Sequence, residues 1–193
     1  MAMESLRLYM REDGLSAEDA VDEVVLMKRR IHTQLVDELD LKRLDLAALS
    51  NNAQVSELRK RVEPLIANLL TREMGGVVAS HEVRARLVKE IADEALGLGP
   101  LEELLADPKV TDILVNNKDQ IYVERGGRLE LTTKKFLSNE QVLAVIERIV
   151  APLGRRVDEA NPMVDARLPD GSRVNAIIPP LAVDGPLLSI RRF

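Results

Sequence analysis

The sequence contains no cysteine and no tryptophan, and aromatic residues make up only 2% of its 193 residues. The absence of cysteine excludes disulfide bonds and thiolate metal sites, and it fits a reducing compartment such as the cytosol. The only two histidines, His32 and His81, stand far apart, so we expect no zinc site. Because hydrophobic residues still make up 46% of the chain, the core must consist of Leu, Val, Ile and Ala.

A long apolar run and an excess of positive charge are also missing. No apolar stretch approaches the roughly 20 residues that a membrane-spanning helix needs. The first residues lack the apolar run and small-residue cleavage site of a secretory signal. We therefore expect a soluble protein without direct membrane insertion. The net charge of -5 and the scarcity of aromatic residues argue against nucleic-acid binding.

The first half of the chain has the periodicity of amphipathic helices. After a loose N-terminal segment over residues 1–15, apolar residues recur at three- and four-residue spacings from the N-cap candidate Ser16 onward. Pro64 should kink or divide the second helix, since it lacks an N–H donor. We interpret residues 16–97 as a three-helix bundle in which leucines form the core and the charges are solvated. The predicted helices cover residues 16–39 (continued by leucines up to 49), 53–74 and 80–96.

The character of the sequence changes near Gly97–Pro100, where glycine and proline interrupt the helical pattern. A short helix is followed by "VTDILVN" and by a hairpin around Gly126-Gly127, both with strand character. A helix capped by Ser138 or Asn139 comes next, and three further strands end in "LLSIRRF". This order predicts that residues 98–193 form an α+β domain, with a mostly antiparallel sheet and a helix packed on one face.

The segment "VDARLPDGSRVNAIIPP" is predicted to be a hairpin around "LPDGS". Alternation along the strands places Asp165, Arg167, Arg173 and Asn175 on one face and apolar residues on the other. Two arginines beside an amide suit an oxyanion such as a phosphate, because guanidinium donates in a planar fork. Spacing alone leaves open an ordinary solvated strand face, with Arg167 or Arg173 paired to Asp165.

For two arginine pairs, Arg155-Arg156 and Arg191-Arg192, spacing also leaves open whether they bind a ligand or are solvated. On a strand the two members of a pair point in opposite directions, so we expect only one of each to face a shared ligand.

The segments "GPLEELLADPKVTDILVNNKDQIYVERGGRLEL" and "GRRVDEANPMVDARLPDGSRVNAIIPPLAVDGPLLSIRRF" together resemble the N-terminal region of the CpaF/TadA-type ATPases. These ATPases belong to the type II/type IV secretion ATPase superfamily and drive assembly of the Flp (tight-adherence) pilus. The resemblance implies a PAS-like domain over residues 98–193, preceded by the helical bundle. It also implies a homo-hexamer in which a RecA-like motor domain follows the PAS-like domain.

The same resemblance implies that ATP lies between the two domains, with Mg²⁺ held only through the motor domain. N-terminal arginines would reach the phosphates: Arg167 and Arg173 with a catalytic role, Arg191 as a further ligand, and Arg192 as a weaker candidate. The expected setting is the cytoplasm, peripheral to the inner membrane through a platform protein of the secretion machinery.

The chain contains no Walker A motif, G-x-x-x-x-G-K-[ST], so we expect no ATPase activity from it alone. The alternative is a free-standing PAS-like sensor or adaptor that binds a small ligand or a partner protein.

Overall fold

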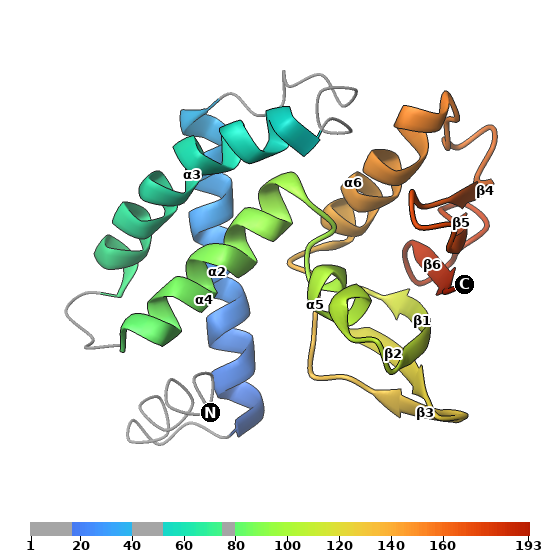
Figure 1. The fold of residues 1–193 in the computed structure, drawn as a ribbon, viewed down its shortest axis with the longest axis horizontal. Coiled ribbons are helices and arrows are strands. Elements are labelled where there is room, and N and C mark those ends of the chain that lie inside the picture. Colours follow the sequence, from blue (N-terminus) through green and yellow to red (C-terminus); the bar gives the residue numbers. More distant parts are fainter. Residues whose placement is uncertain (1–16, 40–51, 75–79) are drawn as a thin grey trace. The chain divides into compact units, whose positions relative to one another are not determined.

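The computed structural model describes residues 17–39, 52–74 and 80–193 (Figure 1). The described residues fall into two compact units, one ending at Leu96 and the other running over Gly97–Phe193. We predict that each unit folds independently of the other. The predicted N-terminal segment, the N-cap Ser16, most of the leucine run over 39–49 and the helix stop at Gly75-Gly76 lie outside the described residues.

The helical unit consists of α2 (Ala17–Glu38), α3 (Asn52–Glu73) and α4 (His81–Leu96), which pack against one another as predicted. Each helix turns an apolar stripe inward, since residues three and four apart share one helix face. The buried residues of the three stripes are Val24, Ile31, Leu35, Val62, Ile66, Leu69, Leu70, Val83, Leu87, Ile91 and Leu96.

Pro64 does not divide α3, which is continuous from Asn52 to Glu73. A proline inside a helix removes one backbone hydrogen bond and crowds the preceding turn. Here Val62 and Ile66, on either side of Pro64, are both 0% exposed. Their burial against the other helices offsets the cost of the proline, so division of the helix, one of the two outcomes expected at Pro64, is ruled out.

Some charges of the helical unit are buried, whereas the sequence pattern suggested that they are solvated. The Asp93 side chain is only 5% exposed and accepts from Arg59 Nη2 of α3 at 2.5 Å and from Lys89 Nζ at 2.7 Å. Glu90 is ion-paired with Lys28 of α2. Because an unpaired buried charge is costly, these pairs favour one alignment of the three helices.

The second unit is built on a six-stranded sheet with the order β3-β2-β1-β6-β5-β4. All neighbouring strands are antiparallel, which confirms the α+β class. The last strand of the chain, β6, lies in the middle of the sheet between β1 and β5 (Figure 1). In chain order the elements are α5 (Leu101–Ala106), β1 (Val110–Asn117), β2 (Gln120–Arg125), β3 (Arg128–Leu131), α6 (Asn139–Val150), the 3-10 turn η3 (Ala151–Leu153), β4 (Met163–Arg167), β5 (Arg173–Ile177) and β6 (Leu187–Arg191).

Local signals set the ends of these elements. Ser138, one of the two proposed caps, begins α6 by accepting a hydrogen bond from the Gln141 N–H at 3.2 Å. Gly126 and Gly127 join β2 to β3 with φ angles of 56° and 76°. Such positive angles fit a two-residue hairpin turn and are strained for other residues.

One face of the sheet is covered by α5 and α6, and alternate strand residues pack beneath these helices. The opposite face of the sheet, called the open face here, carries the remaining alternate residues, including both hairpin arginines. The core residues common to the sheet and the helices include Leu101, Leu104, Ile113, Val115, Ile121, Val123, Val142, Val145, Ile146, Ile149, Val164, Val174, Ala176, Leu188 and Ile190.

Candidate functional site

Three arginines form a row across neighbouring strands on the open face. The strand register pairs Arg167 of β4 with Arg173 of β5, and Arg173 with Arg191 of β6. The row continues on β1, where Asp112 is the cross-strand partner of Arg191, and on β2 with Glu124. We call Arg167, Arg173 and Arg191 the arginine row. The structure therefore brings together three of the four predicted ligand residues.

Arg167 and Arg173 are held especially close. Beside them the Leu168 N–H donates to the Ser172 carbonyl at 3.0 Å. Since hydrogen-bonded and non-hydrogen-bonded pairs alternate along antiparallel strands, Arg167 and Arg173 form a non-hydrogen-bonded pair, whose Cα atoms are about 4.5 Å apart. Both residues are exposed, and like charges directly opposite each other destabilise a sheet.

The turn between β4 and β5 fixes this register. Gly171 has a φ of 88°, and its N–H donates to the Leu168 carbonyl at 2.9 Å. Asp170 Oδ1 accepts from the Ser172 N–H at 2.9 Å, and this hydrogen bond holds the pKa of the Asp170 carboxyl below its usual value. The predicted "LPDGS" turn is confirmed, and it sets the two arginines opposite each other.

Asp165 is not ion-paired with either arginine, so the pairing expected for an ordinary strand face is absent from the described residues. Its Oδ1 accepts from Asn175 Nδ2 at 3.1 Å, while its backbone carbonyl accepts from Arg155 Nη1 at 2.5 Å. Among the residues that the structure describes, Arg167 and Arg173 have no hydrogen-bonded or ion-paired side-chain partner. Two guanidinium groups thus remain available for an anion.

Arg191 is in a different state from its two neighbours. Its Nε donates to Asp112 Oδ1 at 2.9 Å, and the Arg191 side chain is 76% exposed while that of Asp112 is 19% exposed. The hydrogen bond to Asp112 raises the pKa of the Arg191 guanidinium. Arg191 lies in the row but is already bound to a carboxylate.

The structure does not bring Arg192 into the arginine row. Alternation turns this half-buried side chain away from Arg191, as the sequence predicted for the pair. Its Nη1 donates to the backbone carbonyls of Asp107 at 2.5 Å and Val110 at 3.2 Å. Arg192 therefore connects the strand β6 to the loop before β1.

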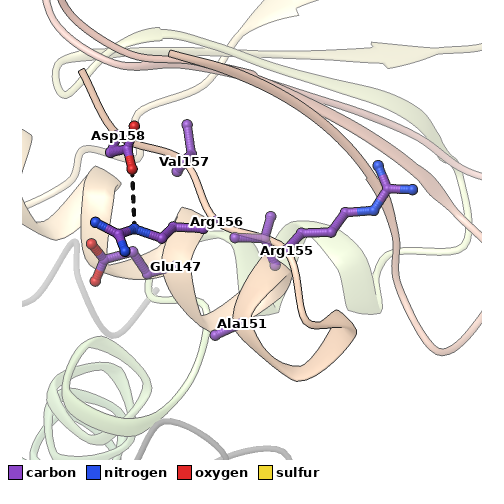
Figure 2. Close-up of a pocket in the computed structure, with 7 residues that line it drawn as sticks. Glu147, Ala151, Arg155, Arg156, Val157 and Asp158 are labelled. Carbon is purple, nitrogen blue, oxygen red and sulfur yellow. Dashed lines mark ion pairs between the residues drawn. The ribbon is translucent and has the colours of Figure 1, made fainter. Parts of the chain in front are cut away.

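The prediction that Arg155 and Arg156 lie on a strand is wrong, because they follow η3 in an irregular segment. They border an open hollow of about 320 Å³ at the end of α6 (Figure 2). Figure 2 shows Arg155 extending away from Asp158, whereas Arg156 Nε pairs with Asp158 Oδ2 at 3.0 Å. The hollow is lined by Glu147, Val150, Ala151, Arg155, Arg156, Val157 and Asp158.

Asp158 organises the loop beside this hollow. Its Oδ1 accepts from the N–H groups of Asn161 at 2.9 Å and Ala160 at 3.0 Å. The hydrogen bond from Asn161 is the main cause of a pKa below the usual value for the Asp158 carboxyl. The carboxylate therefore acts as a turn-forming group, as aspartate side chains do when they accept from the backbone ahead of them.

Over residues 17–39, 52–74 and 80–193, no cluster of three or more acidic or histidine side chains could hold a metal ion. No helix within the same ranges is long and apolar enough to cross a membrane.

Sequence reasoning missed Asp112 and Arg155 as neighbours of the hairpin. A signal existed for Asp112, because alternation along "VTDILVN" sets it opposite in direction to Ile113 and Val115. The sequence contained no signal for its partner, since it does not reveal that β6 pairs with β1.

The family model that matches this chain covers the second unit and only the last residues of the first. The family model described as type II/IV secretion system protein matches residues 94–193. A protein of Mycobacterium tuberculosis named as a conjugal transfer protein is 34% identical over 121 residues, which cover 60% of this chain and 34% of that protein. The type IV secretion system protein VirB11 of Brucella suis is 26% identical over 106 residues, covering 54% of this chain and 29% of VirB11.

Among solved structures, the VirB11 ATPase from the Brucella suis type IV secretion system, in complex with sulphate, is similar with a TM-score of 0.46 and 24% identity. The match covers 49% of this chain and 29% of that chain. The chain thus spans about a third of the length of the M. tuberculosis protein and of VirB11. Since the family model covers more than half of the sequence, this chain belongs to the type II/IV secretion system protein family.

Proposed function

We propose that this chain is the N-terminal portion of a hexameric secretion or pilus-assembly ATPase, in which it contributes phosphate-binding arginines and assembly surfaces. The observation that carries the proposal is the pair Arg167 and Arg173, two exposed arginines opposite each other without an acidic partner in the described part of the chain. Like charges at this spacing cost stability, so a role in binding an anion accounts for their presence.

The chemistry of guanidinium suits a nucleotide phosphate. Arginine offers planar, bidentate donors, and in phosphoryl transfer it stabilises the charge that spreads over the transferring phosphate. The chain has no Walker A motif, so ATP would be shared with a RecA-like motor domain, which would also hold Mg²⁺. Arg167 and Arg173 would act on the phosphates from the N-terminal side of the nucleotide, and this chain alone would not hydrolyse ATP.

A finer assignment rests on the motifs of the chain. The segments around "DARLPDGSRVNAIIPP" and "LSIRRF" support a CpaF/TadA-type ATPase that assembles the Flp pilus. The names of the relatives, a conjugal transfer protein and a type IV secretion protein, agree with transport machinery of this wider class. We infer a cytoplasmic homo-hexamer that docks on an inner-membrane platform protein.

The test is the ATPase rate of the hexamer that contains this chain together with its motor domain. Arg167→Ala and Arg173→Ala should each reduce turnover by up to about a thousandfold while the hexamer still assembles. Arg173→Lys should recover only part of the rate, because an ammonium group keeps the charge and loses the planar fork.

The matched control is Arg128→Ala, which removes an exposed arginine from β3 at the opposite edge of the same sheet. Its turnover should stay near that of the parent. Parent-like rates in both Arg167→Ala and Arg173→Ala would show that these arginines belong to a solvated strand face.

The hollow beside α6 favours a second candidate, a PAS-like sensor or adaptor. Val150, Ala151 and Val157 give it apolar walls, and Arg156 and Asp158 border it (Figure 2). Ala151→Trp should fill the hollow, because Ala151 lines it and is only half-buried. A sensor would then lose its ligand or partner, whereas the ATPase would keep its turnover.

A further inference from the structure

The three arginines of the row differ in what surrounds them, and the difference lies in Asp112. Arg191 and Asp112 are cross-strand partners, and the neighbouring Arg192 N–H donates to the Thr111 carbonyl at 2.8 Å. Arg191 and Asp112 are therefore a non-hydrogen-bonded pair, the arrangement in which side chains lie closest. This explains the 2.9 Å hydrogen bond between Arg191 Nε and Asp112 Oδ1.

A carboxylate and a phosphate present similar acceptors to a guanidinium group. An anion that binds over Arg167 and Arg173 would find the third arginine one strand away, about 4.8 Å further along the row. Asp112 takes the Nε–H of Arg191, and this ion pair draws the guanidinium toward β1 and away from Arg173. An anion over Arg167 and Arg173 would thus share the Arg191 guanidinium with a carboxylate that already holds one of its donors.

The surroundings of Asp112 make loss of its ion pair with Arg191 costly. Its partner on the other side is Glu124 of β2, which also contributes to the raised pKa of Arg191. Like charges opposite each other destabilise a sheet, so removing Arg191 would leave two acidic side chains side by side. The Asp112–Arg191 ion pair therefore favours the anion-free state.

We propose that Asp112 is a positioning residue that holds Arg191 away from the anion site and sets the affinity of the arginine row for polyphosphate. The inference rests on the proposed function, since it requires the row to bind phosphate. It adds that Arg167 and Arg173 bind first, and that Arg191 turns toward the anion only as its ion pair with Asp112 weakens.

The experiment is calorimetric titration of this 193-residue chain with inorganic tripolyphosphate at low ionic strength. Asp112→Asn keeps the shape of the side chain and removes the competing charge. It should tighten binding about three- to fivefold, the upper part of the range for breaking an exposed ion pair. Glu124→Gln is the matched control, because it removes an equal charge one strand further along the row and should change the affinity less.

A double-mutant cycle with Arg191→Ala separates this role from a general field effect. In the Arg191→Ala background, Asp112→Asn should give no gain in affinity, because no arginine is left to release. A second measurement follows the Arg191 Nε–Hε resonance by NMR. In the parent chain, tripolyphosphate should shift this resonance toward the position that it has in phosphate-bound Asp112→Asn.

Different results refute the role of Asp112 and the phosphate site itself. An equal gain from Asp112→Asn and Glu124→Gln, or a gain that persists without Arg191, would refute the role of Asp112 and leave the phosphate site intact. Unchanged tripolyphosphate affinity in Arg173→Ala would instead refute the site on which the proposed function rests. The absence of binding in both the parent chain and Asp112→Asn would refute both ideas.

Discussion

Neutralising Arg173 and neutralising Arg191 should change the stability of the sheet in opposite directions. Arg173 lies between two arginines, whereas Arg191 has Asp112 as its partner on one side. Arg173→Gln removes a repelling charge and keeps most of the hydrocarbon stem. Arg191→Gln breaks the ion pair with Asp112 and leaves the repulsion between Asp112 and its cross-strand partner Glu124 without a compensating charge.

The size of the first effect follows from Coulomb's law. Two guanidinium groups about 7 Å apart in a medium close to water repel by about 0.6 kcal/mol. Arg191 adds less because its charge is offset by Asp112. We therefore expect Arg173→Gln to raise the free energy of sheet opening by about 0.5 kcal/mol at low salt, a value within the range for cross-strand pairs. The gain should vanish at 1 M salt, where the screening length is about 3 Å.

Native-state hydrogen exchange of the amides of β5 measures this quantity in the sheet itself, without contributions from the helical unit. Arg173→Gln should slow exchange at Val174 and Ala176, and Arg191→Gln should accelerate it. Arg128→Gln, at the opposite edge of the sheet, is the control and should change neither. A loss of protection in Arg173→Gln, or a gain that persists in high salt, would show that repulsion within the row does not contribute to the free energy of sheet opening.

Three further predictions concern the rest of the chain. Limited proteolysis should cut near Gly97–Pro100 and release a folded fragment that begins near residue 98, and unfolding of both fragments would contradict two independent domains. Asp170→Ala should destabilise the sheet at neutral pH, because it removes the acceptor for the turn N–H. Folding lowers the pKa of Asp170, so the stabilisation by its carboxylate is complete above the unfolded pKa of about 3.9 and is lost as the pH falls through the lower folded pKa. The melting temperatures of parent and variant should therefore converge in acid. Gly185→Ala should cost more stability than Gly171→Ala. Both positions have a positive φ (110° and 88°), but of the two only Gly185 would place a Cβ against another side chain, 3.0 Å from Asn139 Oδ1. Equal losses of melting temperature would show that Asn139 moves aside freely.

Local patterns predicted most of the elements correctly. The "LPDGS" turn, the Gly126-Gly127 hairpin and the cap of α6 depend on neighbours within a few residues, so the sequence contains their causes. Alternation along β4 and β5 placed Arg167 and Arg173 on one face for the same reason. The continuity of α3 through Pro64 was not predictable in this way, because burial of Val62 and Ile66 against other helices outweighs a local preference.

The sequence by itself determined which residues share a face of each strand, and hence that Arg167 and Arg173 point the same way. Only the tertiary structure decided which strands are neighbours. The pairing of β6 with β1 joins Arg191 to Asp112 across 79 residues of sequence. Alternation gives each strand its two faces, but the order of strands depends on how all of them together bury their apolar faces under α5 and α6. The different states of Arg173 and Arg191 are therefore a consequence of sheet topology.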